Sequence, residues 1–265
     1  MKKINIILLM MLFYATTSFA QINLKNGLVA CYPFNANAVD ATGNNNNGTV
    51  NGATLTTDRF GKSNAAYNFD GGSYIAVSPD QFKNKSYTYS VWVKLDIIPV
   101  EEDNNTFLAI GGPGADQVLS CTNNYSSLAS KGFQSGGYNV GNPVISNNWT
   151  GILPNVNRWY HVLVTRDDVS IKLYVDGVSI MDNSSRTSTG GTDVGYANPT
   201  YVTIGSRVGA DGYFQSLQGS LDDIYIYNRA ITPEEVTALY QQTSKSTPCE
   251  DGVIACHPFS VVKTK

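Results

Sequence analysis

Histidine and glutamate are scarce in this chain, and their scarcity argues against zinc sites and against common catalytic sites. The sequence holds two histidines, His161 and His257, and four cysteines, and their spacing matches no zinc-binding pattern. A glycosidase requires two carboxylates that flank the scissile bond. The five glutamates lie outside the core strands that the sequence predicts, and neither Glu-x-Asp-x-Glu nor Glu-x-Asp-x-x-Glu occurs. The nucleophile motif Gly-x-Ser-x-Gly is also absent. The sequence therefore predicts no catalytic site.

Charge and long apolar runs are sparse too. Charged residues make up 15% of the chain and the formal net charge is −3. Nucleic-acid binding relies on clustered Lys and Arg, so we expect no nucleic-acid partner. No segment after residue 20 is long and apolar enough for a membrane span.

The N-terminus has the pattern of a secretory signal peptide. Lys2 and Lys3 precede a mostly apolar run over residues 4–13, and Ser18-Phe19-Ala20 places small residues where a signal peptidase cuts. We therefore expect residues 1–20 to be removed and the protein to be secreted. About 245 residues remain, which suits one large all-β domain or two small ones.

Export permits disulfides among Cys31, Cys121, Cys249 and Cys256. Three pairings are possible, and sequence alone does not choose among them. Cys249 and Cys256 are close along the chain and form the pair that we favour.

Short β-like segments alternate with turn clusters along residues 21–243. Residues 86–95 are rich in aromatic residues and valine, and residues 159–166 and 170–175 form a hairpin pattern. One helix is predicted after Thr232, with Pro233 at its first position and Glu235 completing a capping box. Many strands with one short helix predict an all-β, two-sheet sandwich.

The last long strand segment, residues 219–227, carries an acid that alternates with isoleucines. Side chains of a strand point to opposite faces with period two. Asp222, Ile224 and Ile226 are therefore predicted to share the buried face, with Asp223 on the other. A buried Asp needs a partner, so this strand marks a place to look for a site.

Residues 244–265 form a separate tail. Its segment 252–260 repeats the Ala-Cys-x-Pro-Phe of residues 30–34. We interpret the tail as the stub of a second repeat, which would be disordered or paired at an edge; the alternative is chance similarity.

The order of these segments resembles the laminin-G-like, concanavalin A-like domains of secreted bacterial proteins. Seven stretches carry the resemblance, in order over residues 27–241: 27–34, 40–49, 68–71, 90–94, 159–162, 173–177 and 219–223. The resemblance implies a two-sheet antiparallel jelly-roll sandwich with one short C-terminal helix. That fold hosts lectins, binding modules, adhesion domains and glycosidases, so it does not settle function.

Many proteins that the chain resembles hold a calcium ion between the polar loop and the final strand. Calcium takes six to eight oxygen ligands. Here Asp40, Asn44 and Asn46 of the loop and Asp222 of the strand would supply them. The alternative is that the loop residues make Asx turns and that Asp222 accepts backbone hydrogen bonds.

Aromatic residues in loop-like stretches are the candidates for stacking on sugar rings. Trp149 is the first of these, joined by Tyr138, Tyr196 and Tyr213. Trp92 and Trp159 lie in predicted strands and are expected in or near the core. His161 alternates with Trp159 and Leu163 in one predicted strand and is expected to be structural.

The leading hypothesis is a secreted, non-catalytic, calcium-stabilised module that binds a polysaccharide or glycoconjugate. The alternative is an adhesive or structural protein that recognises a cell-surface protein. A glycan-degrading enzyme with unfamiliar catalytic residues is the third reading.

Overall fold

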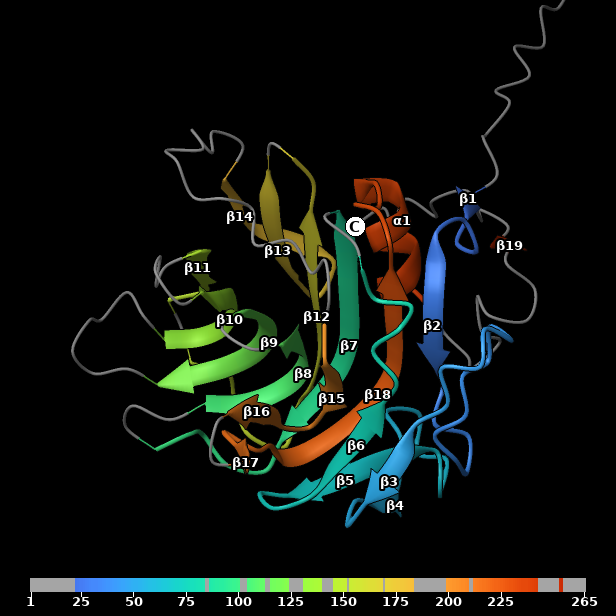
Figure 1. Ribbon diagram of the computed structural model, residues 1–265, viewed down its shortest axis with the longest axis vertical. Coiled ribbons are helices and arrows are strands. Elements are labelled where there is room, and N and C mark those ends of the chain that lie inside the picture. Colours follow the sequence, from blue (N-terminus) through green and yellow to red (C-terminus); the bar gives the residue numbers. More distant parts are fainter. Residues whose placement is uncertain are drawn as a thin grey trace, which may run out of the picture.

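The computed structural model describes residues 22–83, 86–100, 104–112, 115–123, 131–139, 145–151, 153–168, 170–183, 199–209, 212–242 and 253–254. Within them two large antiparallel sheets pack against each other, with one short helix at one end (Figure 1). The predicted all-β sandwich is confirmed.

The seven-stranded sheet has the order β11-β10-β9-β8-β15-β6-β3. Its strands are β3 (Thr49–Asn51), β6 (Tyr74–Val77), β8 (Asn104–Gly112), β9 (Ala115–Asn123), β10 (Lys131–Asn139), β11 (Ile145–Trp149) and β15 (Tyr201–Ile204). A two-stranded hairpin of β16 (Arg207–Gly209) and β17 (Gly212–Phe214) follows β15.

The eight-stranded sheet has the order β14-β13-β12-β7-β18-β5-β4, and β2 also pairs with β18. Its strands are β2 (Leu28–Tyr32), β4 (Thr54–Thr56), β5 (Ala66–Asp70), β7 (Tyr87–Leu95), β12 (Trp159–Arg166), β13 (Ile171–Val175), β14 (Val178–Asn183) and β18 (Gln218–Tyr227). β18 lies at the centre because β7 borders one of its edges and β5 and β2 share the other.

The main core lies between the two sheets. Alternate residues of each strand enter it, as the period of two predicts. They include Tyr89, Val91 and Val93 of β7, Val162 and Val164 of β12, and Phe107, Leu119 and Ile204 of the facing sheet. A second cluster on the outer side of the eight-stranded sheet joins Leu163, Tyr225 and Tyr227 to Val236 and Leu239 of helix α1 (Pro233–Tyr240).

A β-bulge in β18 overturns the predicted alternation of that strand. Asp222 pairs with Trp92, the next pair of the ladder is Tyr225 with Ser90, and Asp223 has φ +40°. The extra residue reverses the order of the faces. Leu221 therefore joins Ile224 in the main core, and Asp222 does not share that face. The predicted common face of Asp222, Ile224 and Ile226 is wrong.

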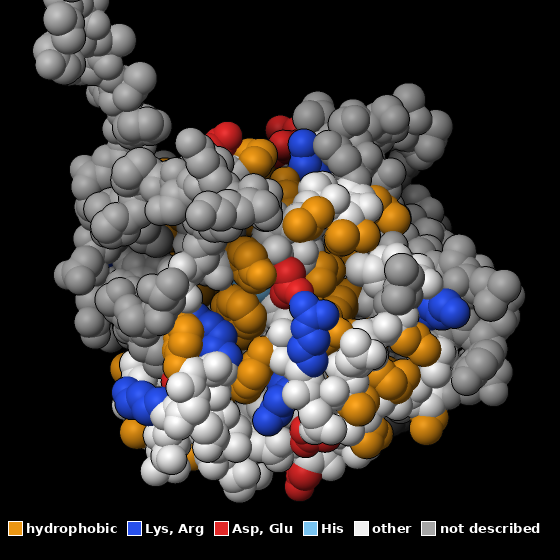
Figure 2. Space-filling model, turned by 180° about the vertical axis from the view of Figure 1, so that it is seen from behind, with side chains coloured by type: hydrophobic (Ala, Val, Ile, Leu, Met, Phe, Trp, Pro, Cys, Tyr) orange, Lys and Arg blue, Asp and Glu red, His pale blue; other side chains and the backbone are white. Residues whose placement is uncertain are grey.

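The surface seen from behind carries hydrophobic side chains around a hollow, with basic and acidic side chains among them (Figure 2). The large hydrophobic residues that are exposed in the described part of the chain are Val39, Val50, Phe60, Ile97, Val100, Val156, Val178 and Ile180. They come from different strands and loops, and single exposed apolar residues of this kind are normal on a soluble surface.

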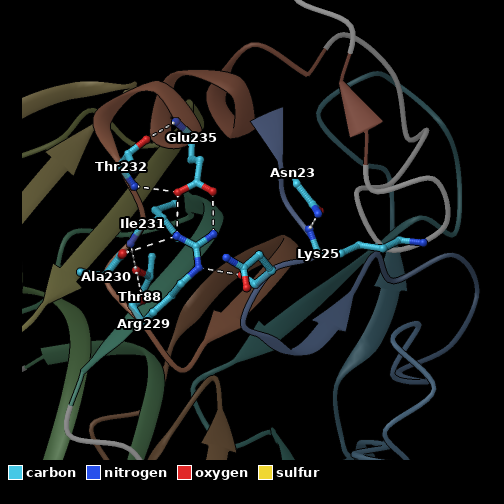
Figure 3. A network of polar contacts seen from close by, with 9 residues as sticks. Asn23, Lys25, Thr88, Arg229, Ala230, Ile231, Thr232 and Glu235 are labelled. Carbon is cyan, nitrogen blue, oxygen red and sulfur yellow. Dashed lines mark hydrogen bonds and ion pairs between the residues drawn. The ribbon is translucent and has the colours of Figure 1, made fainter. Parts of the chain in front are cut away.

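Helix α1 begins at the capping box that the sequence predicts. Thr232 Oγ1 accepts a hydrogen bond from Glu235 N at 3.3 Å, and Glu235 Oε2 accepts one from Thr232 N at 2.8 Å (Figure 3). Arg229 holds the same carboxylate with Nη1 and Nη2, at 2.8 and 2.6 Å. Thr88 of β7 accepts a hydrogen bond from Ile231 N and so ties the start of the helix to the sheet.

The tail has one described contact with the rest of the chain. β19 (Val253–Ile254) pairs with β1 (Ile22–Asn23). Cys121 is a buried free thiol, whereas the favoured partners Cys249 and Cys256 lie outside the described residues. No helix in the described part of the chain is long and apolar enough to cross a membrane.

Candidate functional site

The outer side of the seven-stranded sheet gathers hydrogen-bonding side chains, which we call the polar face. It is defined by the hydrogen-bonded side chains of Asn104, Asp116, Ser120, Gln134, Tyr201, Arg207 and Gln215. Asp116 and Ser120 stand four residues apart on β9 and so share a face. The residues between them that point to the other side include Gln117, bonded to Tyr87, and Leu119 of the core.

An ion pair forms one half of the polar face. Arg207 of β16 donates from Nη2 to Asp116 Oδ1 at 2.9 Å and from Nε to Asp116 Oδ2. Tyr201 donates its hydroxyl to Asp116 Oδ2 at 3.1 Å, and Arg207 Nη1 donates to Gln215 Oε1 at 3.1 Å. Burial, then the Asp116 carboxylate, raises the pKa of Tyr201, so its phenol stays protonated. The bidentate pair fixes the β16–β17 hairpin to the sheet.

An amide network forms the other half. Gln134 Nε2 of β10 donates to Asn104 Oδ1 of β8 and to Ser120 Oγ of β9, both at 2.8 Å. Gln134 and Asn104 are half-buried, whereas Ser120 is buried. Two amide groups, from β8 and β10, are therefore held in fixed positions on this face, and the buried Ser120 of β9 supports one of them.

Three of the four predicted sugar-stacking residues map to this sheet and its hairpin. Trp149 of β11 pairs in register with Gln134, and Tyr138 of β10 pairs with Asp116. Tyr213 of β17 pairs with Val208, next to Arg207. These are backbone positions; the side chains of the three, and all of Tyr196, lie outside what the structure describes. Sequence reasoning did not identify Asp116, Arg207, Gln134 or Tyr201. The alternation of Asp116, Val118 and Ser120 with Leu119 and Cys121 was the available signal.

The predicted calcium ligands divide into two groups. Asp40 accepts hydrogen bonds from Cys31 N, Thr42 N and Asn46 N. Asn44 and Asn46 both donate their Nδ2 to Val29 O at 2.9 Å. Asp222 instead contacts Arg59. Within the described residues no group of three or more His, Cys, Asp or Glu could hold a metal ion. The residues as placed do not fit a calcium site, because N–H donors occupy the Asp40 oxygens.

A chelator is therefore expected to leave the melting temperature of the protein unchanged. The loop is already stabilised by hydrogen bonds to Asp40, and Asp222 has Arg59 as a counter-charge. The check is a thermal melt with EDTA, with added Ca²⁺ and with added Mg²⁺ as the control. A fall in Tm with EDTA that Ca²⁺ alone restores would support the calcium hypothesis.

Asp222 belongs to a buried cluster on the outer side of the eight-stranded sheet. Arg59 Nη1 lies 3.3 Å from Asp222 Oδ2 and also contacts Asp223 Oδ2, so the bulge brings both acids to one cation. The prediction that these two acids point apart is wrong for the same reason. The Arg59 guanidinium lies 4.5 Å from the Trp92 ring centroid.

His161 of β12 lies beside this cluster, as a structural histidine would. Its Nε2 is 2.8 Å from Ser90 Oγ, and its ring centroid is 5.2 Å from that of Trp92. Burial, then the nearby Arg59 charge, lowers the pKa of His161 to about 3. His161 is therefore neutral near neutral pH. Trp92 is buried and Trp159 is half-buried, as expected.

Residues 69–237, more than half of the chain, match the family model described as the concanavalin A-like lectin/glucanases superfamily. A comparison with curated proteins gave no significant match.

Several solved structures share the fold. Domain 4 of AbnA, a GH43 extracellular arabinanase from Geobacillus stearothermophilus in complex with arabinotriose, has a TM-score of 0.61 at 22% identity, covering 81% of this chain and 98% of that one. Trypanosoma rangeli sialidase in complex with sialic acid has a TM-score of 0.54 at 22% identity, covering 81% of this chain and 33% of the sialidase. The binding domain of botulinum neurotoxin DC in complex with SialylT has a TM-score of 0.58 at 11% identity, covering 82% and 51%. At these identities the likeness shows the fold alone.

Proposed function

Since this chain belongs to the concanavalin A-like lectin/glucanase superfamily, we propose that it is a secreted, non-catalytic module that binds a polysaccharide or glycoconjugate. The observation that carries the proposal is the polar face, where Gln134, Tyr201 and Arg207 are half-buried and held by neighbours. A binding site needs a few polar groups in fixed positions beside apolar or aromatic surface.

The register of the seven-stranded sheet supports this location. Trp149 and Tyr138 are the ladder partners of Gln134 and Asp116, so aromatic positions border both halves of the polar face. Aromatic rings offer apolar faces for sugar rings, while amides and hydroxyls bond sugar hydroxyl groups. The AbnA domain, whose structure contains arabinotriose, provides a related fold with a neutral oligosaccharide bound.

A non-catalytic role is supported by the chemistry of this face. Glycoside hydrolysis generally requires two carboxyl groups that flank the scissile bond. The polar face contributes one carboxylate, Asp116, which already takes hydrogen bonds from Arg207 and Tyr201. Of the five glutamates, Glu234 and Glu235 lie in the first turn of α1, and the others lie outside the described residues. Failure to release reducing sugar from a polysaccharide panel would agree with this role.

Gln134→Ala is expected to weaken retention on the recognised polysaccharide about tenfold, because the face loses the Gln134 amide and Asn104 loses the hydrogen bond that positions it, and each hydrogen bond contributes about 1 kcal/mol. The measurement is affinity electrophoresis of the mature chain on a panel of soluble polysaccharides. Gln218→Ala, which removes an exposed glutamine from the other sheet, is the matched control.

Equal retention of the two variants would contradict the assignment of the polar face. Trp149→Ala tests the aromatic part of the site: loss of retention would support stacking of Trp149 on a sugar ring. Binding to whole cells with no polysaccharide retained would instead favour the adhesive alternative with a protein ligand.

A further inference from the structure

The Asp116–Arg207 pair bears on which glycans the polar face accepts, an inference that rests on the proposed function. Each of the three Arg207 guanidinium nitrogens has a partner inside the protein: Nε and Nη2 bond Asp116, and Nη1 bonds Gln215. Arginine is the residue best suited to bind a sugar carboxylate, through two parallel hydrogen bonds. In this protein the Asp116 carboxylate already accepts those two hydrogen bonds from Arg207.

The polar face also carries no net charge. Among the seven residues that define it, Arg207 is the one base and Asp116 is the one acid. The Asp116 side chain is 5% exposed and that of Arg207 is 20% exposed. Water therefore screens this pair less than an open surface pair. A ligand carboxylate that approached Arg207 would also approach Asp116, and like charges placed together select against a ligand.

The remaining groups of the face are neutral and suit hydroxyl groups. Gln134 and Asn104 carry amide groups and Tyr201 carries a hydroxyl, whereas the buried Ser120 supports Gln134 from within the sheet. Sugar hydroxyls both donate and accept, so they can bond such a set without bringing charge. The pKa of Tyr201 is raised, which keeps this phenol neutral too.

We infer that the polar face takes neutral glycans and that Asp116 determines this specificity by occupying Arg207. Removing the charge of Asp116 leaves the positive charge of Arg207 on the face without that carboxylate. The site then accepts uronic or sialic acid residues, which the native protein disfavours.

The test compares neutral polysaccharides (arabinan, xylan and mixed-linkage glucan) with acidic ones (polygalacturonate and alginate) in affinity electrophoresis at low and high salt. The native protein is expected to bind a neutral polymer at least about tenfold more tightly than any acidic one. Its retention should change little with salt, because no net charge is neutralised on binding. This comparison needs no variant and decides the preference for neutral glycans even where a variant fails to fold.

Asp116→Asn is expected to gain about tenfold in affinity for an acidic polymer, a gain that high salt removes. Asp176→Asn is the matched control, because it makes the same change of charge and frees Arg158, 2.7 Å from Asp176, away from the polar face. Tyr201→Phe keeps the carboxylate and should keep the neutral preference.

Tighter binding of acidic than of neutral polymers by the native protein would overturn the inference and leave the proposed function standing. An equal gain in the two Asn variants would overturn the role of Asp116. Retention of the native protein on no polymer would overturn the proposed function itself.

Discussion

Replacing Arg59 with methionine is expected to lower the free energy of unfolding by about 3–5 kcal/mol, the usual cost of breaking a buried ion pair by removing one of its members. Arg59 Nη1 lies 3.3 Å from Asp222 and also contacts Asp223, and the three side chains are at most 5% exposed. Methionine keeps much of the packing against Trp92 but removes the cation. The two acids would then face each other in a site from which water is excluded.

Urea unfolding at neutral pH measures this change. Arg158→Met is the matched control: it removes an arginine from the ion pair with Asp176, in which Arg158 is 56% exposed, and should cost at most about 1 kcal/mol. The triple variant R59M/D222N/D223N should recover part of the loss, since it also removes the two negative charges of the cluster. Similar losses for the two single variants would refute a special role for the buried cluster.

The second large effect is a loss of folding stability at acidic pH, caused by His161. The pKa of His161 in the folded protein is lowered to about 3 by burial and by Arg59, whereas an unfolded histidine titrates near 6.5. Between these values the unfolded chain binds more protons than the folded one. Stability from this residue is therefore complete above about pH 6.5 and falls as the pH decreases toward 3, by up to about 1.4 kcal/mol per pH unit.

The window from about pH 6.5 to 5 isolates this effect, because most carboxyl groups titrate below it. Unfolding free energies of the native protein and of His161→Gln should be measured across that window. The native protein should lose stability steadily, and the variant should show a flatter profile. Parallel profiles for the two proteins would mean that another group controls the acid response.

The fold could be predicted because its signals are local. The capping box at Thr232 and the alternating strand at residues 86–95 each appear within a few consecutive residues, and both are present as expected. The face of Asp222 could not be predicted in the same way. The bulge falls at two adjacent acids, Asp222 and Asp223, where either register gives a plausible hydrophobic pattern.

The polar face depends on contacts that are distant in sequence. Arg207 and Asp116 are 91 positions apart, and Tyr201 reaches the same carboxylate across 85 positions. Neither pair leaves a motif in the chain. Local composition was enough to predict the aromatic candidates. Their position beside Gln134 and Asp116 follows only from the strand register, in which Trp149 pairs with Gln134 and Tyr138 with Asp116.

The central place of β18 sets the order in which this protein can fold. β18 is formed by residues near the end of the domain, yet it pairs with β2 near its start, as in Ile224 with Tyr32. It also joins β5 to β7, so the eight-stranded sheet stays in three parts (β7 with β12–β14, the β4–β5 pair, and β2) until residues 218–227 arrive. Strand pairs this distant along the chain carry a large loop-closure entropy, and folding that depends on them is slow. A chain still emerging from a ribosome would therefore hold only fragments of the sandwich until its last long strand is made.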